Sequence, residues 1–444
     1  MATKRVYTPT PEQIALAEER RLKREKKPPS SDPQLEVASK APIITRPWVH
    51  LQKSDVSHNG TSQRVKIMTW NLLAQCLVRR ELFPTSDCLK AAQRESMLHS
   101  ELLAPKADIL LLQEVDRLEK LVPILEKSGY SHQYGAGPRK KHGCLIAYSA
   151  KFKQTDTRTI QYDEQEVRSD GTESARRGSS FKTKNIGLLV ALQSTENPDK
   201  GVIVATTHLF WHPRYTYERA RQAGILLREV VRFQSDIHRA DWPCVIGGDF
   251  NFAPDDPAYS LLVGDLLLPS QQTALGQSRV VHISIDPAVP AAAKPPVDDD
   301  GEEGDPDRVI TNARPAARDD GLLTDAELAS LFSGASSPLR SAYDVGLSSA
   351  TESVKNVPGF GERVCLPSSR RGRHEPEWTS YTHYWKTVLD YIFIRDPPQR
   401  RSVVTGVLKP HVTKDLEPGL PKKGVSASDH VSLCAEIEWV NETK

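Results

Sequence analysis

Apolar and polar positions alternate in blocks from about residue 63 to the C-terminal end of the chain. Eight apolar runs have the length and composition of buried strands: VKIMTWNLL (65–73), ADILLLQEV (107–115), GCLIAYS (143–149), IGLLVALQ (186–193), GVIVATTHLF (201–210), PCVIGGDFN (243–251), VLDYIFI (388–394) and VSLCAEIEW (431–439). Residues 87–105 and 217–240 place apolar side chains three and four positions apart, which predicts amphipathic helices. Continuously apolar strands separated by helices indicate sheets covered by helices, and therefore an α/β fold.

Two regions break this pattern. Residues 1–62 are basic and polar, and we expect a largely disordered tail with one helix that begins near Thr10. The run RRLKREKK within it predicts either a nuclear-import or RNA-contact patch or an ordinary solvated helix. Residues 287–320 are rich in Pro, Ala and acidic side chains, which predicts a disordered insertion, followed by a helix at 322–332. We therefore expect one folded domain, 63–444, interrupted by this acidic insertion.

Composition narrows the picture further. With 38% hydrophobic residues and 32 prolines in 444 residues, the chain fits a packed core combined with disordered segments. The net charge of +2 does not by itself indicate a nucleic-acid partner. The six cysteines are scattered without a C-x-x-C pair, which argues against a zinc site or a disulfide framework. We expect neither a membrane span nor secretion, and residence in the nucleus, the nucleolus or the cytoplasm.

Polar residues able to bind a metal ion or a phosphate stand at the ends of six strand-like runs or directly beside them. They are Asn71, Glu114, His208, Asp249 with Asn251, Asp390, and Asp429 with His430. Each alone has an ordinary explanation, because Asn and Asp suit the turns that end strands and a single His is more often structural. Six such coincidences are hard to assign to turn chemistry, and strand ends are where α/β folds build their sites.

The chemistry of this set suits the cleavage of phosphate esters. Carboxylates such as Glu114, Asp249 and Asp429 are hard oxygen ligands for Mg²⁺, with Mn²⁺ as the alternative. A neutral amide can donate to a phosphate oxygen without competing for the cation. A histidine held by a carboxylate can transfer a proton.

The stretch VIGGDFNFAP (245–254) carries two of these residues. In an extended backbone, positions i and i+2 point the same way, so Asp249 and Asn251 would face one phosphate together while Phe250 packs inward. The glycines before them would leave room for close approach.

Several of these stretches together resemble the endonuclease/exonuclease/phosphatase superfamily. The motifs that carry the resemblance occur in the superfamily's order: TWNLL, LLLQEVD, THLFWHP, GGDFNFAP, SAYD, EPEWTSYTHYWKTVLDYIFI and SDH. They resemble its RNA 3′-exonuclease branch, which contains the deadenylases, nocturnin, 2′-phosphodiesterase and the yeast nocturnin-like exonucleases. THLFWHP followed by YERARQ leans toward the last two groups. The fold that the resemblance implies is a four-layered α/β sandwich, with two packed β-sheets flanked by helices.

The resemblance also implies a role for each strand-end residue. Glu114 matches the principal Mg²⁺ ligand, and Asp429 matches a second metal ligand. Asn71 matches an amide beside the metal. Asp249 matches the carboxylate that orients or deprotonates the attacking water, and Asn251 the amide that steadies the pentacoordinate phosphate.

The remaining matches concern proton transfer and the substrate. His430 matches the active-site histidine, and Asp390 the carboxylate that orients it. His208 and Pro213 match positions that line the phosphate and nucleotide pocket. Whether one metal ion or two take part is left open by the sequence.

The aromatic residues expected to contact a base depart from the family pattern. A Phe that stacks on a base in the deadenylases is replaced here by His383, Tyr384 and Trp385. Any of these faces can accept a base, but a preference for poly(A) is left open. His142 stands where many relatives carry an acid.

Two basic clusters could follow an RNA backbone. They are Lys140 with Lys141, and Arg370 with Arg371 and Arg373. Ordinary solvated loop charge is the alternative for both clusters. The leucine-rich repeats of some deadenylases are absent, which argues against recruitment through that module.

Together with the chemistry of these residues, the resemblance implies a Mg²⁺-dependent 3′→5′ exoribonuclease that releases nucleoside 5′-monophosphates from single-stranded RNA. A 2′-5′ oligoadenylate phosphodiesterase or a nucleotide phosphatase with the same metal centre is the enzymatic alternative. An inactive RNA-binding scaffold is the alternative from another class, and the complete set of site residues argues against it. The sequence does not indicate protein partners.

Overall fold

The computed structural model describes residues 43–51, 62–290, 312–334, 337–349 and 357–441. The predicted N-terminal helix and its basic run lie outside these residues.

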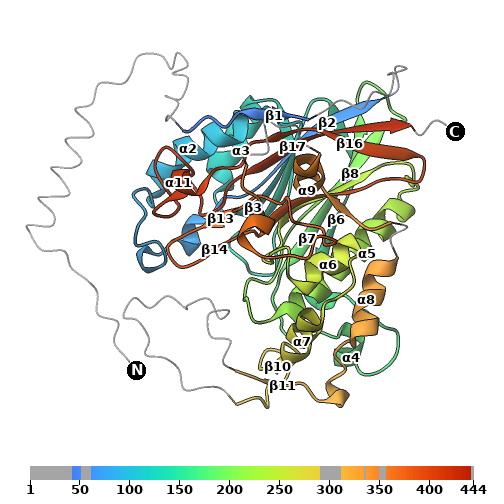
Figure 1. Ribbon diagram of the computed structural model, residues 1–444. Helices are drawn as coiled ribbons and strands as arrows, with labels where there is room; N and C mark the ends of the chain where they lie inside the picture. The colour runs from blue at the N-terminus through green and yellow to red at the C-terminus, as the bar shows by residue number, and fades with distance from the viewer. Residues whose placement is uncertain (1–42, 52–61, 291–311, 335–336, 350–356, 442–444) are drawn as a thin grey trace, which may run out of the picture. The chain divides into compact units, whose positions relative to one another are not determined.

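The strands form two large sheets (Figure 1). The seven-stranded sheet has the order β1 (Trp48–His50), β16 (Arg400–Leu408), β17 (Leu433–Asn441), β2 (Gln63–Asn71), β3 (Ile109–Val115), β5 (Gly143–Ser149) and β4 (Tyr130–Gly135). The six-stranded sheet has the order β12 (Arg340–Ser341), β15 (Asp390–Arg395), β9 (Cys244–Asp249), β8 (Gly201–His208), β7 (Ile186–Ser194) and β6 (Phe152–Gln161). β2 pairs with β3 in parallel, as β8 does with β9.

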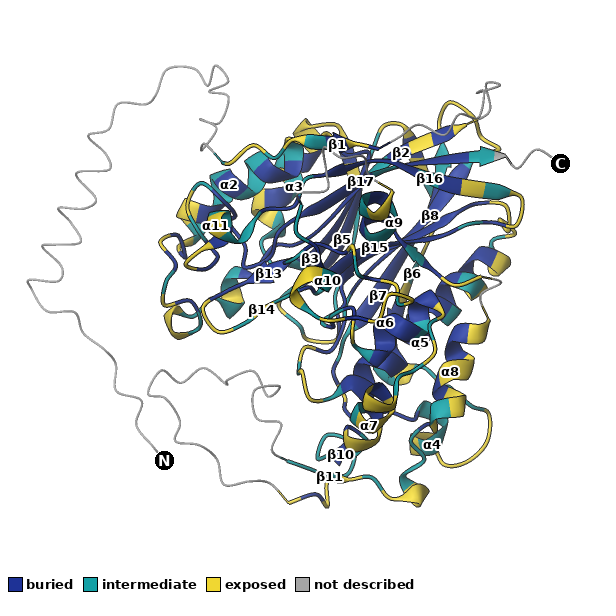
Figure 2. Ribbon diagram, viewed as in Figure 1, coloured by how far each residue is buried: buried dark blue, intermediate teal, exposed yellow. Residues whose placement is uncertain are grey.

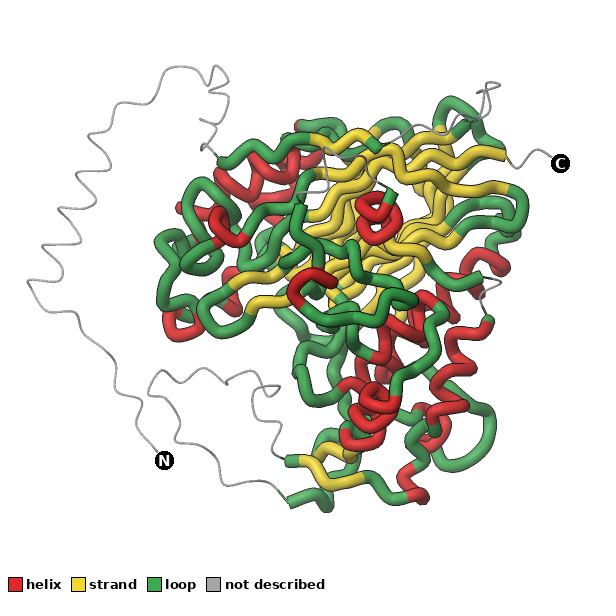
Figure 3. The backbone as a smooth tube through the Cα atoms, in the orientation of Figure 1, coloured by secondary structure: helices red, strands yellow, loops and turns green. Residues whose placement is uncertain are grey.

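Helices cover the outer face of each sheet (Figures 1 and 3). α2 (Ala91–Leu103) and α3 (Leu118–Lys127) pack on the seven-stranded sheet, and α5 (Thr216–Asp236) packs on the six-stranded sheet with α6 (Pro257–Val263) and α8 (Asp325–Ser333). The smaller elements are α4 (Glu173–Arg177), α7 (Pro269–Gln277), α9 (Ala342–Ser348), α10 (Phe360–Arg363), α11 (Thr413–Leu416), the pair β10 (Val280–His282) and β11 (Ala313–Pro315), and the pair β13 (Ser380–Tyr381) and β14 (Lys386–Thr387). The expected four-layered α/β sandwich is confirmed.

Side-chain alternation explains how one strand serves two cores. In β3, Ile109 and Leu111 belong to the core between the sheets, while Leu110 and Leu112 belong to the core beneath α2 and α3. All four side chains are fully buried, and Figure 2 shows the central strands buried along most of their length. Burial on both faces is the reason that these strands are continuous apolar runs in the sequence.

The glycines of β9 serve the packing of the sheets. A Cβ atom at Gly247 would lie 2.7 Å from Leu111 Cδ1 in the facing sheet, and one at Gly248 would lie 2.3 Å from the Thr207 carbonyl oxygen in β8. The close approach that these glycines permit is therefore between strands and between sheets.

All eight predicted strands are present, as β2, β3, β5, β7, β8, β9, β15 and β17, and the helices predicted at 87–105, 217–240 and 322–332 correspond to α2, α5 and α8. Among the strands of six residues or more, β4, β6 and β16 escaped prediction. β4 and β6 lie at sheet edges, and β6 has the largely polar sequence FKQTDTRTIQ with few buried positions. β16 lies between the three-residue β1 and β17, and its sequence RRSVVTGVL begins with polar residues. An edge strand with one solvent-exposed face lacks the continuous apolar run by which a central strand is recognised.

Two boundaries drawn from composition were wrong. The ordered domain begins before residue 63, because β1 pairs with β16. Residues 312–320 are part of the fold rather than of a disordered insertion, since β11 pairs with β10 and Arg314 contacts Asp286 at 2.9 Å and Asp320 at 2.7 Å. Composition averages over a window, so it could not detect these anchoring ion pairs. Residues 291–311 lie outside the described part of the chain.

Two bulk properties accompany this architecture. All six cysteines carry free thiols, and four of them are buried. Among the helices that the structure describes, none combines the length and the apolar character that crossing a membrane requires.

Glu375 is a fully buried carboxyl between α10 and β13. Its Oε1 accepts a hydrogen bond from Tyr259 Oη at 2.9 Å, and its Oε2 has no hydrogen-bond partner among the described residues. Burial, reinforced by the charge of Asp344, raises the pKa of Glu375 to about 8 from its ordinary value of 4.5. The folded protein therefore holds this proton at neutral pH.

We expect Glu375→Gln to flatten the dependence of stability on pH. Below pH 4.5 both the folded and the unfolded wild-type chain hold the proton. Between the two pKa values only the folded chain holds it, so the free energy of unfolding falls as the pH rises toward 8. Gln stays neutral throughout. In thermal unfolding, the Tm of the variant should exceed that of the wild type by about 4 °C or more near pH 9, and the gap should close near pH 5. Parallel curves of Tm against pH would refute this.

Candidate active site

Three neighbouring strands of the six-stranded sheet place His208, Asp249 and Asp390 side by side. His208 and Asp249 are the last residues of the parallel strands β8 and β9, and they are paired in register. β15 runs antiparallel to β9, so its first residue, Asp390, also pairs with Asp249. A residue that begins an antiparallel strand thus reaches the same sheet edge as residues that end parallel ones.

The facing seven-stranded sheet contributes Asn71 at the end of β2. The side chain is buried, and its Nδ2 donates to Glu114 Oε1 at 3.1 Å and to Asp249 Oδ2 at 2.9 Å. Its Oδ1 accepts a hydrogen bond from the Leu73 N–H at 2.9 Å. Asn71 therefore links a carboxylate of one sheet to a carboxylate of the other.

Glu114 reaches this position through a break in strand geometry. Regular alternation in β3 would direct it to the side of Leu110 and Leu112, toward the helices. The register between β3 and β5 shifts between Leu112 and Val115, and Glu114 has a φ of +55°. Such a conformation is unfavourable for a residue with a side chain and recurs at functional sites. The Ala74 N–H donates to Glu114 Oε2 at 2.8 Å and holds the carboxylate in place.

The Oδ2 atom of Asp249 is where the donors of the site meet. Besides Asn71 Nδ2, His208 Nε2 lies 3.5 Å and His430 Nε2 lies 3.6 Å from it. Burial raises the pKa of Asp249 to about 7, an effect that His430 opposes and the charge of Asp390 reinforces. A carboxylate whose pKa lies near neutrality is suited to accept a proton as a general base.

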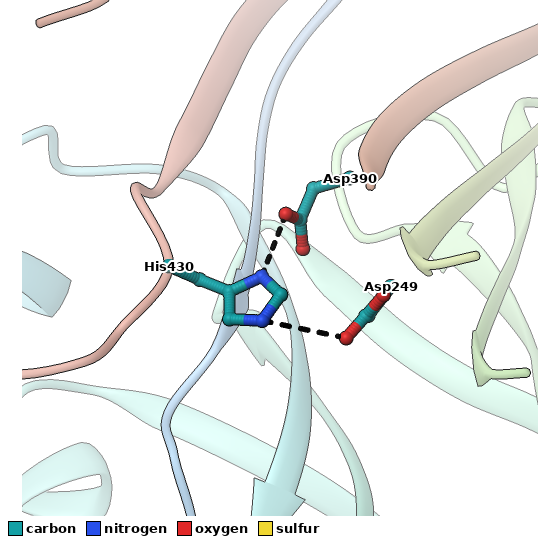
Figure 4. Close-up of side chains that lie close together, drawn as sticks. All are labelled: Asp249, Asp390 and His430. Carbon is teal, nitrogen blue, oxygen red and sulfur yellow. Dashed lines mark hydrogen bonds and ion pairs between the residues drawn. The ribbon is translucent and has the colours of Figure 1, made fainter. Parts of the chain in front are cut away.

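His430 is held between two carboxylates (Figure 4). Its Nδ1 lies 2.8 Å from Asp390 Oδ2, and its Nε2 faces Asp249. Burial alone would lower the pKa of His430, but the charges of Asp390 and Asp249 outweigh it and raise the pKa well above its usual value. Trp70 Nε1 donates to the His430 carbonyl oxygen at 3.0 Å. The result is an oriented, protonated imidazole beside a carboxylate that can take up a proton.

His208 is neutral at neutral pH. Burial lowers its pKa to about 4, and its Nδ1 lies 3.8 Å from Glu114 Oε1. The ring of His142 lies 6.4 Å from that of His208. Burial opposes the ionisation of Glu114, but the two imidazoles and two hydrogen bonds outweigh it and lower the pKa of Glu114. A neutral His208 carries no charge that could stabilise the Glu114 carboxylate. The hydrogen bonds from the Ala74 N–H and Asn71 Nδ2 stabilise the ionised form of Glu114 whatever the charge of His208.

The predicted metal ligands, Glu114 and Asp429, lie outside the group of ligand atoms that cluster most closely. Among the described residues that group is Asp249, Asp390 and His430, within 4.8 Å of one another, and the imidazole already occupies the space between the two carboxylates. Burial raises the pKa of Asp429 to about 6. The charge of His430 opposes this increase, and the charge of Glu114 adds to it. A divalent cation held by Glu114 and Asp429 would relieve this repulsion.

Asn251 does not extend β9, contrary to the prediction from strand alternation. β9 ends at Asp249, and the φ of +55° at Asn251 turns the backbone. The Asn251 N–H donates to Asp249 Oδ1 at 3.0 Å, and its Nδ2 donates to the Leu209 carbonyl oxygen at 2.9 Å. Phe250 packs in the core as expected. Asn251 thus lies beside Asp249 because of a turn, and its backbone orients that carboxylate.

The three aromatic residues predicted to contact a base lie on the hairpin of β13 and β14. Ser380 in β13 forms a bridge with His430, so the hairpin starts at the site. His383 and Tyr384 are exposed at its tip, Tyr384 to 62%. Trp385 is half-buried, and its Nε1 donates to Ser380 Oγ at 3.1 Å. His383 and Tyr384 offer accessible faces for stacking, whereas Trp385 supports the hairpin.

Lys140, rather than Lys141, is the lysine held at the site. Its Nζ donates to Asn185 Oδ1 at 3.0 Å, and Asn185 Nδ2 donates to the His208 carbonyl oxygen at 2.9 Å. Lys141 and Pro213 are exposed. Asn185 was not predicted from the sequence, because the predicted site residues stand where strands end and Asn185 directly precedes β7.

All three arginines predicted to follow an RNA backbone make contacts within the protein. Arg370 Nε lies 3.6 Å from Asp265 Oδ2 and its side chain is mostly buried, and Arg373 Nη1 donates to the Leu366 carbonyl oxygen at 2.8 Å. Arg371 is half exposed, and its Nε lies 3.9 Å from Asp265 Oδ1. Arg370 is too buried to be the ordinary solvated loop charge of the alternative, and an RNA contact by Arg371 stays a prediction.

Comparisons with known proteins identify a family for this chain. Residues 68–430 match the endonuclease/exonuclease/phosphatase family. The RNA exonuclease NGL2 of Saccharomyces cerevisiae is 29% identical over 89% of this chain and 82% of its own length. The 2′,5′-phosphodiesterase 12 of Bos taurus is 26% identical over 63% of this chain and 50% of its own.

A solved structure shares the fold. The crystal structure of ANGEL2, a 2′,3′-cyclic phosphatase, superposes with a TM-score of 0.54 at 22% identity, over 89% of this chain and 99% of that one. The family match extends over most of the chain and includes every strand-end residue from Asn71 to His430. This protein therefore belongs to the endonuclease/exonuclease/phosphatase family, as its motifs predict.

Proposed function

We propose that this protein is a Mg²⁺-dependent 3′→5′ exoribonuclease that hydrolyses single-stranded RNA from its 3′ end and releases nucleoside 5′-monophosphates. Its family, together with relatives named RNA exonuclease and 2′,5′-phosphodiesterase, supports a hydrolytic phosphodiesterase. The observation that carries the proposal is the convergence of Asn71, His208 and His430 on Asp249 Oδ2, at 2.9, 3.5 and 3.6 Å. A carboxylate oxygen in this setting is suited to orient a water molecule and remove its proton.

The residues present fit a divalent cation. Glu114 and Asp429 are the carboxylates that we assign to it, because burial and their mutual repulsion raise the pKa of Asp429 to about 6. Mg²⁺ binds through few carboxylates and retains water, which suits a two-carboxylate set, and Mn²⁺ is the alternative. When bound, the cation would polarise the phosphoryl group and stabilise the leaving oxygen.

The side chains of the protein divide the remaining work. Asn71 orients Asp249 toward the attacking water through its Nδ2. His430, fixed by Asp390 at 2.8 Å, donates from Nε2 to the charge that develops on the phosphate. The neutral imidazole of His208 donates a hydrogen bond to a phosphate oxygen without competing for the cation.

RNA is the substrate that we infer for this centre. The yeast relative is named an RNA exonuclease. The exposed faces of His383 and Tyr384 suit the stacking of unpaired bases next to the site. The ammonium group of Lys140, held by Asn185, suits a backbone phosphate.

A 2′-5′ phosphodiesterase is the second candidate, because a bovine relative carries that name and the two activities need the same centre. An inactive RNA-binding scaffold is disfavoured because the chain has the complete set of Asn71, Glu114, Asp249, Asn251, Asp390 and His430.

The deciding experiment offers the purified protein 5′-labelled RNA with an adenosine tail, RNA of mixed sequence, 2′-5′-linked oligoadenylate and single-stranded DNA, each with Mg²⁺ and with a chelator. We expect a ladder that shortens from the 3′ end of RNA, nucleoside 5′-monophosphates as products, and complete arrest by the chelator with recovery on addition of Mg²⁺. Undiminished cleavage in the chelator would exclude the metal mechanism. Preference for the 2′-5′ linkage would establish the second candidate, and binding of RNA without any hydrolysis would establish the scaffold.

A further inference from the structure

Arg94 is a buried cation in α2, and its guanidinium group binds the backbone beneath the site. Nη2 donates to the carbonyl oxygens of Leu72 and Leu73, the latter at 2.6 Å, and Nε donates to the Ala427 carbonyl oxygen at 2.6 Å. Nη1 donates to Gln75 Oε1 at 3.0 Å. Only 2% of the residue is exposed. One side chain thus joins the segment that follows β2 to the segment that precedes β17.

The first of these segments holds Asn71 in place. Leu72 and Leu73 come directly after it, and the Leu73 N–H donates to Asn71 Oδ1 at 2.9 Å. The φ of +55° at Leu73 turns the chain away from the sheet. Carbonyl groups in such a turn lack the partners that a strand supplies, and buried carbonyls need donors. Arg94 supplies them for Leu72 and Leu73.

The second segment carries Asp429 and His430. Ala427 lies two residues before Asp429, and between them Ser428 Oγ donates to the Asn71 carbonyl oxygen at 2.6 Å. Ser428 Oγ also accepts a hydrogen bond from the His430 N–H at 3.1 Å. The two segments are therefore joined through Ser428 as well as through Arg94.

The charge of Arg94 faces the acidic centre as well. Burial lowers the pKa of its guanidinium group, and the carboxylates of Asp429, Asp116 and Glu114 oppose that effect, in this order. An arginine stays protonated in proteins. Arg94 contacts none of the three carboxylates through a hydrogen bond, so it acts on the site through the loops and through its charge.

We propose that Arg94 is a positioning residue: it fixes the loop after β2 against the loop before β17, so that Asn71 and the pair Asp429 and His430 face the same phosphate. This role rests on the proposed hydrolysis of phosphodiesters at the site. The planar fork of donors explains why an arginine is required, because a lysine would have one nitrogen for four acceptors on two segments.

The test compares Arg94→Lys with a matched control, Arg221→Lys. Arg221 lies in α5, is fully buried, and donates to the Arg177 carbonyl, Glu218 and the Tyr162 carbonyl at 2.8, 3.0 and 3.1 Å, away from the loops in question. We expect Arg94→Lys to lower kcat on single-stranded RNA roughly 10- to 100-fold and to change KM less than about 3-fold, because misplacement of reacting groups slows the chemical step. Arg221→Lys should lower Tm and leave kcat unchanged.

Hydrogen exchange supplies a readout that needs no substrate. In Arg94→Lys the amides of residues 72–77 and 426–431 should exchange faster, with the rest of the fold unchanged. If Arg94→Lys does not fold, Ser428→Ala removes the second link and should show the same local exchange with a kcat lowered roughly 10-fold. A wild-type kcat in Arg94→Lys would overturn the proposal, and so would a loss of kcat in Arg221→Lys as large as that in Arg94→Lys at an equal loss of Tm. If the wild-type protein cleaves no RNA, the proposed function fails, and kcat is then measured on a chromogenic phosphodiester while exchange still decides the role of Arg94.

Discussion

Asp249→Asn is expected to lower kcat for RNA hydrolysis by roughly 10³- to 10⁴-fold without unfolding the protein. Asn has the shape of Asp and keeps an Oδ1 that accepts the Asn251 N–H. It cannot take up a proton, and it would place an amide nitrogen where Asn71, His208 and His430 now direct their nitrogens. Both effects remove the base and disturb its neighbours.

Single-turnover hydrolysis of 5′-labelled RNA measures this effect, with Tm recorded alongside. The matched control is Asp108→Asn, a buried carboxylate just before β3, whose Oδ2 accepts the Lys66 N–H at 2.9 Å at the opposite end of that strand from Glu114. The control should lower Tm and leave kcat unchanged. A kcat for Asp249→Asn within about 10-fold of the wild type would show that another group removes the proton.

Glu114→Gln is expected to weaken Mg²⁺ binding at least 10-fold and to lower kcat by roughly 10³-fold. Gln keeps an oxygen that can accept a hydrogen bond from the Ala74 N–H or from Asn71, so the local structure should survive. The substitution removes the negative charge with which Glu114 attracts the cation. Asp429 is then the only carboxylate of the assigned pair that is left to bind the cation.

Calorimetric titration with Mg²⁺ in the absence of RNA measures the first effect independently of activity. Glu229→Gln is the matched control, because Glu229 is also a largely buried carboxylate but pairs with Arg228 and Arg232 on α5. Mg²⁺ affinity equal to that of the wild type in Glu114→Gln would remove this residue from the set of metal ligands.

Much of this protein could be predicted from its sequence because its central strands are buried on both faces. Such strands must be apolar at every position, so they stand out as runs, and all eight runs are strands. A polar residue at the end of such a run is equally visible. Asn71, His208, Asp249 and Asp390 were found in this way, and the structure brings them to one edge of the sandwich.

Strands with a solvent-exposed face were harder to predict from the sequence. β6 lies at a sheet edge and alternates between polar and apolar residues too weakly to be recognised. The boundaries at β1 and β11 were misplaced for a related reason, since each short strand is fixed by partners distant in sequence. Composition contains no information about such partners.

By itself, the sequence determined the layers of the fold, the family and the residues that gather at the sheet edge, because burial and strand ends leave local patterns. Only the tertiary structure decided how these residues face one another. A bulge and a positive φ turn Glu114 from the helix side toward Asn71, and a turn rather than a strand brings Asn251 to Asp249. Arg94 binds two loops whose proximity depends on the pairing of β2 with β17. Contacts of this kind depend on register and backbone turns between distant segments, and a periodic pattern of apolar residues records only which side chains are buried.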